Sequence, residues 1–175
     1  GTARRERAYD RPVTPKPALL ALTFGLAARA AGADCWTASV VDAPGTDVAG
    51  ASLAIGPDGP VVSYSKRLGS APSSIEFARS TGSTWALEHV ADQGSALTSV
   101  AIDPSSGEPG IAYAYSDGLY FARRAAGAWS IDPRIATGSG LGATSLAYGP
   151  TGPCISSWAG GLVRVATHDG TWTLD

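Results

Sequence analysis

The chain is predicted to be an all-β protein built from a tandem repeat. Three segments share one pattern: SLAIGPDGPVVSY at 52–64, SVAIDPSSGEPGIAY at 99–113 and SLAYGPTGPCISS at 145–157. Glycine (22 residues) and proline (12 residues) separate short apolar runs throughout, as in proteins made of short strands. Four tryptophans recur at intervals of 49, 44 and 43 residues, namely Trp36, Trp85, Trp129 and Trp172. A period of about 45 residues indicates one supersecondary unit used repeatedly.

Each unit is expected to contain four short strands. In the first unit these are 52–55, 60–64, 75–79 and 85–90, with turn residues between them. The third strand alternates with period two, so every second side chain is predicted to point into a buried face. The residues predicted to point inward are Ile75, Phe77, Leu119, Phe121, Val163 and Val165.

A small residue follows the third-strand pattern in every unit, as Ala78, Ala122 and Ala166. We interpret these alanines as places where a neighbouring sheet approaches closely. The repeated tryptophans are interpreted as large rings packed between adjacent sheets, with a carbohydrate-stacking surface as the alternative.

Four-stranded units of this length in tandem resemble the blades of a β-propeller. The motif S-L-A-x-x-P-x-G-x-P-x-I-A-Y, followed by an aliphatic-aromatic-Ala strand and G-x-W, resembles the repeats of bacterial exported propellers, related to the BNR or Asp-box repeats of sialidase-like proteins. The resemblance implies three blades, at about 47–91, 96–136 and 142–175, plus one extra strand at 35–41. It also implies that the tryptophan strands lie outermost. Three blades leave open sheet edges, so we expect further blades or association of copies.

The Asp box itself is incomplete. Residues 78–85 keep the G-x-T-W half of the motif, but Ser80 stands where the family has aspartate. In the third unit Asp169 is directly adjacent to Gly170 instead. Since the Asp box staples a blade turn in that family and is not its catalytic apparatus, the resemblance implies a fold rather than hydrolysis.

Residues 1–33 have the order of a secretory signal peptide. A basic segment (4–16) precedes an uncharged apolar run (18–28), and Ala31-Gly32-Ala33 forms a small-x-small cleavage site. The apolar run is too short to span a bilayer as a helix. The alternatives are an N-terminal helix packed on the domain or a short membrane anchor. With a signal peptide at 1–33, the partial propeller domain is expected at 34–175. The protein is then predicted to be secreted, periplasmic or on the cell surface, and only the leader is expected to contact a membrane.

Charge and cysteine content exclude several classes of function. The leader carries six basic and two acidic residues, so the body bears the acidic excess, which argues against nucleic-acid binding. Cys35 and Cys154 are expected either to form a disulfide or to remain free thiols. His89 and His168 lie far apart and there is no C-x-x-C, so no metal site is predicted. No phosphate-binding or dinucleotide motif is present, so no cofactor is predicted.

No catalytic residue is assigned. A glycosidase needs two carboxyl groups across a cleft, and the candidates are Asp58, Asp103, Glu108 and Asp117. Asp58 and Glu108 lie in turns between Pro and Gly, which is the usual place of acidic turn residues. No Ser-His-Asp set is identifiable.

A ligand site, if the chain has one, is expected where the loops after the second strands converge at one end of the axis. These loops contain Lys66, Arg67, Tyr115, Asp117 and Trp158. Trp158 falls outside the repeat series, so it is either an exposed stacking surface or a ring folded over the blade edge. We therefore predict a non-catalytic exported binding or scaffolding module for carbohydrate or protein. The alternatives are a fragment of a sialidase-like glycoside hydrolase and a structural remnant without ligand.

Overall fold

The computed structural model describes residues 38–42, 47–92, 97–137, 141–142 and 144–175. The chain divides into two compact units, residues 1–38 and 39–175, and all the described strands belong to the second unit. The predicted leader at 1–33 and Cys35 lie outside the described residues. Within the described ranges no helix is long and apolar enough to cross a membrane.

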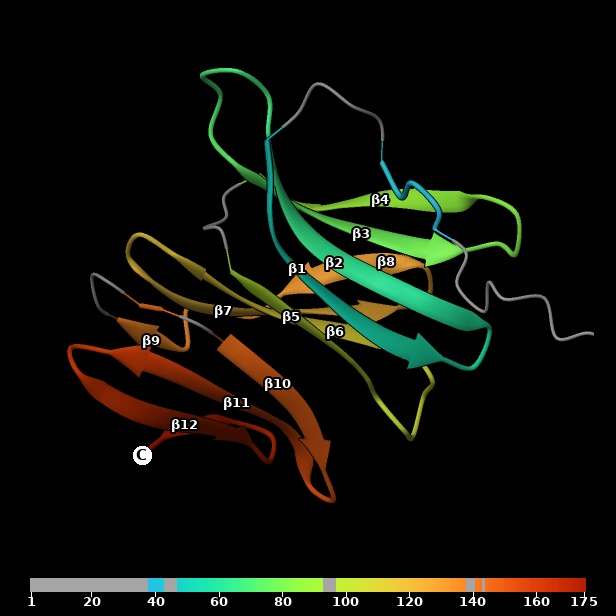
Figure 1. The fold of residues 1–175 in the computed structure, drawn as a ribbon. Coiled ribbons are helices and arrows are strands. Elements are labelled where there is room, and N and C mark those ends of the chain that lie inside the picture. The colour runs from blue at the N-terminus through green and yellow to red at the C-terminus, as the bar shows by residue number, and fades with distance from the viewer. Residues whose placement is uncertain (1–37, 43–46, 93–96, 138–140, 143) are drawn as a thin grey trace, which may run out of the picture. The chain divides into compact units, whose positions relative to one another are not determined.

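Three antiparallel sheets follow one another along the second unit (Figure 1). The first contains β1 (Asp47–Gly56), β2 (Gly59–Arg67), β3 (Ser74–Ser80) and β4 (Trp85–Ala91). The second contains β5 (Thr98–Ile102), β6 (Pro109–Tyr115), β7 (Gly118–Ala125) and β8 (Ala128–Ile131), and the short β9 (Ala136–Thr137) pairs with β7. The third contains β10 (Thr144–Gly149), β11 (Gly152–Ala159), β12 (Leu162–His168) and β13 (Trp172–Leu174).

The prediction of an all-β chain with three four-stranded units is confirmed. The strands of each sheet pair in chain order, because each connection is a hairpin. In the first and third sheets the inner hairpin closes with a two-residue turn at the register pairs Gly56–Gly59 and Gly149–Gly152. Gly59 and Gly152 adopt positive φ angles of 129° and 147°, which explains the glycine that ends each G-P-x-G segment.

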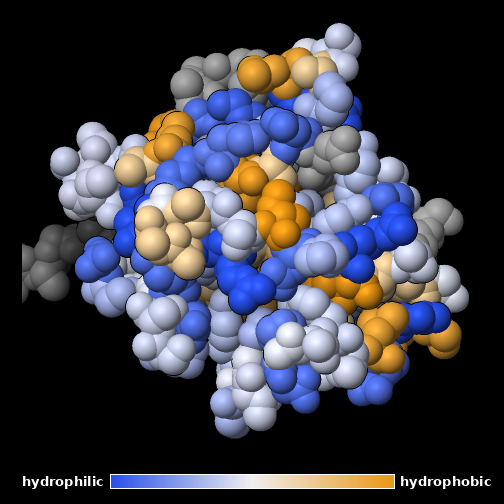
Figure 2. Space-filling model, turned by 180° about the vertical axis from the view of Figure 1, so that it is seen from behind, coloured by the Kyte–Doolittle hydropathy of each residue, from blue (hydrophilic) through white to orange (hydrophobic). Residues whose placement is uncertain are grey.

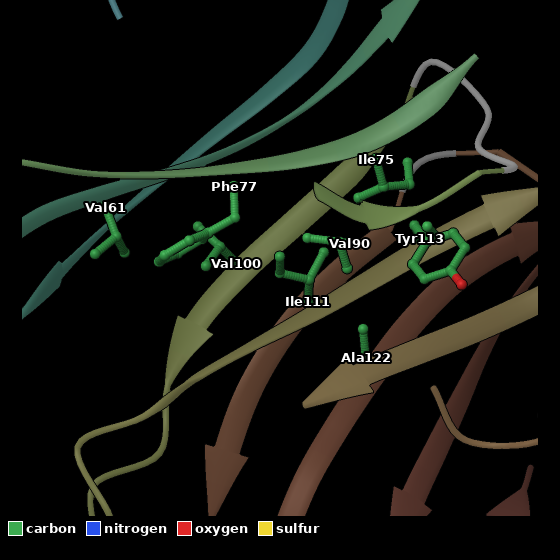
Figure 3. Packing of buried hydrophobic residues seen from close by; sticks show 9 residues of the cluster. Val61, Ile75, Phe77, Val90, Val100, Ile111, Tyr113 and Ala122 are labelled. Atoms are coloured by element: carbon green, nitrogen blue, oxygen red, sulfur yellow. The ribbon is translucent and has the colours of Figure 1, made fainter. Parts of the chain in front are cut away.

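The core lies between the sheets. Nine buried residues join the first and second sheets, and they come from both facing surfaces (Figure 3). Phe77 on β3 and Ile111 on β6 are fully buried there. The second and third sheets meet in the same way through a second cluster, in which Leu119 and Ile155 are fully buried. Each internal sheet face is therefore covered by the next sheet along the chain.

The repeated alanines allow this close packing. Ala78, Ala122 and Ala166 are each 0% exposed. Ala122 and Ala166 lie in the two clusters between sheets, which confirms the prediction for them, whereas Ala78 is buried with residues of its own sheet and Val41. A larger side chain there would force the neighbouring surface apart, since interiors tolerate added volume poorly.

The predicted alternation of the third strand is confirmed in the first two sheets and wrong in part of the third. Ile75, Phe77, Leu119 and Phe121 are buried to within 2%. Val163, at the position equivalent to Ile75 and Leu119, is 76% exposed. The reason is that no described sheet covers that face of β12, so a side chain placed for burial meets solvent instead.

The repeated tryptophans link neighbouring sheets, as predicted. The Trp129 ring packs edge-on against Phe77 of the preceding sheet, with ring centroids 5.2 Å apart. Its indole N–H donates to Glu88 Oε2 at 2.8 Å. Trp172 repeats the arrangement one sheet later, against Phe121 and with a 2.9 Å bond to Asp132 Oδ2.

Each tryptophan acceptor lies three residues after the tryptophan of its own repeat. Glu88 follows Trp85 by three residues, and Asp132 follows Trp129 by three. Ser39 occupies the same position after Trp36, and its Oγ accepts the Trp85 indole N–H at 3.3 Å. The repeat therefore encodes a donor for the preceding sheet and an acceptor for the following one.

The extra strand expected at 35–41 is not found in its described part. Residues 38–42 are irregular, because no described strand runs beside them to complete a ladder. They are held by side chains instead: Asp42 accepts hydrogen bonds from Tyr64 and Lys66, both at 2.9 Å.

Replacing Trp129 with phenylalanine tests the indole bond. The change keeps a ring beside Phe77 but removes the donor to Glu88, so we expect Trp129→Phe to lower the free energy of unfolding by about 1–2 kcal/mol. Trp85→Phe is the matched control, because its bond goes to an uncharged serine, and we expect a cost of about 0.5 kcal/mol or less. Denaturant unfolding measures both. Equal losses in the two variants would contradict a specific contribution from the charged acceptor.

Candidate functional site

A pocket of about 360 Å³ opens between the second and third sheets. Its volume falls within the range of about 300–1,000 Å³ that is usual for small-molecule sites. Turn residues, third-strand residues and one first-strand aromatic supply its polar wall, namely Asp103, Glu108, Arg123, Arg124, Asp132, Tyr148 and His168. Phe121 contributes an apolar surface.

At this junction the repeat departs from the first junction at two aligned positions and in the turn beside them. Gly110 stands where the first sheet has Val61, and Tyr148 stands where the second sheet has Ile102. A methyl group at Gly110 would collide with Tyr148 Oη and would lie 2.8 Å from the Phe121 ring. The glycine therefore makes room for the tyrosine at this junction.

The equivalent space between the first and second sheets is closed. Val61 and Ile102 line it together with Arg79, and its volume is only about 10 Å³. The turn beside this space also differs: four residues (56–59) connect Ile55 to Pro60, whereas six (103–108) connect Ile102 to Pro109. Asp103, Ser106 and Glu108 of the longer turn line the open pocket.

Two arginines bring positive charge to the pocket, and each is paired. Arg123 Nη2 donates to Asp132 Oδ1 at 2.6 Å. Arg124 donates from Nε to Glu88 at 2.9 Å and from Nη1 to Glu108 at 3.1 Å. The hydrogen bond to Glu88, followed by that to Glu108, raises the pKa of Arg124 above its ordinary value. These pairs hold the side chains in place and leave a polar wall with slightly more acidic than basic groups.

Asp103 shapes the turn at the pocket rim. Its Oδ1 accepts hydrogen bonds from the backbone N–H and hydroxyl of Ser105, at 2.8 and 2.7 Å, and its Oδ2 accepts from the Ser106 hydroxyl at 2.9 Å. Partial burial by itself would raise the pKa of this carboxyl, but the bonds from Ser105 and Ser106 outweigh it and lower the pKa. Asp103 is thus a fixed carboxylate acceptor.

Tyr148 supplies a neutral hydroxyl beside these charges. Burial, with a smaller contribution from the Asp103 charge, raises the pKa of Tyr148 to about 12. The phenol therefore keeps its proton and can both donate and accept hydrogen bonds. His168, which ends β12 in the same sheet as Tyr148, packs edge-on against Trp172, with ring centroids 5.0 Å apart. Fixed acceptors, fixed donors and ring surfaces together suit a compact ligand rich in hydroxyl groups.

The residues predicted as a ligand site belong to three different sheets. Lys66 pairs with Asp42 at 2.9 Å, and Arg67 Nε donates to Ser73 at 3.4 Å. Asp117 accepts hydrogen bonds from Tyr120 and from Arg134, the latter at 2.8 Å.

The two aromatic residues of that prediction lie at the ends of second strands. Tyr115 ends β6 and lines a shallow hollow with Tyr113 and Tyr120. Trp158 is 47% exposed near the end of β11. A site at these loops stays a prediction. So does the disulfide, since Cys154 is half-buried on β11 and its expected partner lies outside the described residues.

Sequence reasoning missed the inter-sheet pocket. It interpreted Glu108 as a turn residue only and singled out neither Arg123 nor Tyr148. The sequence did contain a sign of this site. Gly110 and Tyr148 stand at repeat positions where the other units have aliphatic residues or cysteine. Among the residues that the structure describes, no three His, Cys, Asp or Glu side chains are grouped to hold a metal ion.

Comparison with known proteins supports the fold. No family model matches the chain, and no curated protein matches it in sequence. It is similar to a solved fucose lectin from Kordia zhangzhouensis in complex with methyl-fucoside, with a TM-score of 0.51 and 14% identity, covering 72% of this chain and 97% of the lectin. At this identity the likeness shows the fold alone: a β-rich structure whose sheets are consistent with propeller-like blades. The relationship to Asp-box repeats stays a prediction.

The hydrogen bonds to Asp103 predict its titration. Because its pKa is lowered in the folded state, the carboxylate stabilises the fold above its ordinary pKa of 3.8, and this contribution is lost as the pH falls through the lower folded value. Ser105→Ala combined with Ser106→Ala removes the two hydroxyl bonds and leaves the bond from the Ser105 backbone N–H, so we expect the Asp103 pKa to rise in an NMR titration. Asp58, an exposed turn aspartate, serves as the control. An unchanged Asp103 pKa in the double variant would contradict this account.

Proposed function

We propose that residues 39–175 form a non-catalytic carbohydrate-binding module, with the pocket between the second and third sheets as its binding site. The observation that carries the proposal is that this junction holds a pocket of about 360 Å³ with a polar wall, whereas the equivalent space at the first junction is only about 10 Å³. The likeness in fold to a lectin solved with methyl-fucoside supports the same class of ligand.

The charges of the pocket favour a neutral sugar. Arg123 and Arg124 are already paired with carboxylates, and Asp103, Glu108 and Asp132 outnumber them along the wall. A ligand carboxylate would meet this acidic excess without a free cation to bind it. Hydroxyl groups, in contrast, can donate to the carboxylates and accept from the arginines.

The same groups argue against glycoside hydrolysis at this pocket. A general acid needs a carboxyl group that keeps its proton near neutral pH, which requires a raised pKa. The pKa of Asp103 is lowered, and Asp132 is held by the Arg123 guanidinium and the Trp172 indole N–H. We therefore retain the binding module over the sialidase-like hydrolase.

A double variant tests the pocket. Gly110→Val with Tyr148→Ile places the aliphatic pair of the first junction at the second and removes the tyrosine hydroxyl from the pocket, so we expect affinity for methyl-fucoside, or for the best ligand on a glycan array, to fall by at least tenfold. Trp158→Ala, at the loop site predicted from sequence, is the matched comparison and should bind as the parent chain does. Titration calorimetry measures affinity, and thermal unfolding checks the fold.

The outcomes separate the alternatives. Binding lost in Trp158→Ala and kept in the double variant would place the site at the loops and overturn the pocket. No binding to any sugar on the array would overturn the carbohydrate proposal. Turnover of a fluorogenic sialoside that disappears when one carboxylate is changed would favour the hydrolase.

We also propose that the protein is exported, on the basis of the basic, apolar and small-x-small order of residues 1–33. We expect a bacterial host expressing the chain to release a product cleaved after Ala33, as N-terminal sequencing of the exported fraction would show. Arg substitutions within 18–28 should keep the product in the cell. Retention of the unmodified chain with residues 1–33 intact would contradict export.

A further inference from the structure

The two internal junctions follow one design. Here the trailing face of a sheet means the face turned toward the next sheet along the chain, and the leading face means the opposite one. At each junction the trailing face supplies an aliphatic residue from its third strand, an aromatic residue two positions later and an acidic acceptor. The leading face supplies a first-strand aliphatic residue and a tryptophan donor.

No described sheet covers the outer two faces, which carry equivalent residues, although Val41 packs on part of the leading face of the first sheet. On the trailing face of the third sheet Val163 is 76% exposed, whereas the equivalent Ile75 and Leu119 are 0% exposed. On the leading face of the first sheet Leu53 is 63% exposed, whereas the equivalent Val100 and Leu146 are 5% and 7% exposed. Apolar residues reach the surface in several separate places (Figure 2), but these two stand where the repeat elsewhere buries its core.

The open trailing face also offers a tryptophan acceptor. Asp175 exchanges backbone hydrogen bonds with Val165, as Asp132 bonds Phe121 and as Glu88 pairs with Phe77 in register. Asp175 thus occupies the acceptor position of its repeat. On the open leading face, the Trp85 indole N–H has only the long bond to exposed Ser39.

Part of the leading face is apolar and hollow. A pocket of about 210 Å³ lies there, lined by Val48, Ala51, Val62 and Tyr64 beside the segment 41–42. The face therefore has buried side chains toward its centre and open space beside β1. An incoming sheet would fill this space as the first sheet packs against β5 at the first internal junction.

We propose that the trailing face of the third sheet binds the leading face of the first sheet of a second copy, with Asp175 accepting from Trp85 of that copy. One chain carries both complementary halves, so the occupant that fits each open face is another copy of the same chain. The contact is heterologous, and such contacts form rings when the rotation closes. Two copies of the three described sheets give six, within the four to eight blades of known propellers, whereas three copies of them would give nine.

The oligomeric state of the full chain tests this inference. We expect analytical ultracentrifugation to give twice the chain mass of 17.7 kDa at micromolar concentration. Val163→Asp and Leu53→Asp should each give the monomer mass and unchanged thermal unfolding of the single chain, because both side chains are exposed in it. Leu68→Asp is the matched control: Leu68 is 60% exposed in the β2–β3 loop, outside both faces, and this variant should remain a dimer.

Mixing the two monomeric variants identifies the geometry. Each keeps the face that the other has lost, so an equimolar mixture should again form dimers, joined through one intact contact. A parent chain that is monomeric at these concentrations overturns the proposal. So does a mixture that stays monomeric, or a Val163→Asp variant that remains dimeric, since either result would mean that a different surface, such as an exposed strand edge, joins the copies.

Discussion

The described sheets carry apolar side chains on their faces, and the burial of these faces determines how the rest of the molecule is arranged. A single four-stranded sheet cannot bury both faces, so the sheets pack on one another and the core lies between them. The repeated alanine brings the backbones close, and the tryptophan of one repeat reaches over to a residue of the previous one. Phe77 and Trp129 illustrate the result, because ring packing and an indole bond to Glu88 coincide at one junction.

The candidate binding site arises from a departure within this scheme. At the first junction Val61 and Ile102 fill the space between turn and third strand. At the second, Gly110 and Tyr148 give up part of that packing and expose a wall of paired charges. The loss is confined to the outer part of the junction, while the buried cluster around Leu119 and Ile155 stays intact. A turn that is two residues longer than its equivalent in the first sheet contributes Asp103, Ser106 and Glu108 to the same site.

The same scheme connects the ends of the array with its interior. Val163 and Leu53 are exposed not because their positions are polar but because the neighbour that covers their equivalents is absent from the described chain. These side chains are therefore exposed because they lie on the outer faces of the first and last described sheets. Their exposure carries information about association that the exposure of an isolated loop residue such as Leu68 does not.

Much of the fold could be predicted from the amino-acid order, because the decisive signals are local. Alternation along 75–79, the G-P-x-G turns and the tryptophan period each depend on residues close together in the chain, and the three sheets follow from them. The candidate site could not be predicted in the same way. Whether Gly110 leaves a cavity depends on Tyr148, which lies in a different sheet, and whether Val163 is buried depends on what covers its face. Such contacts form only when separate sheets meet, so they were decided by tertiary packing.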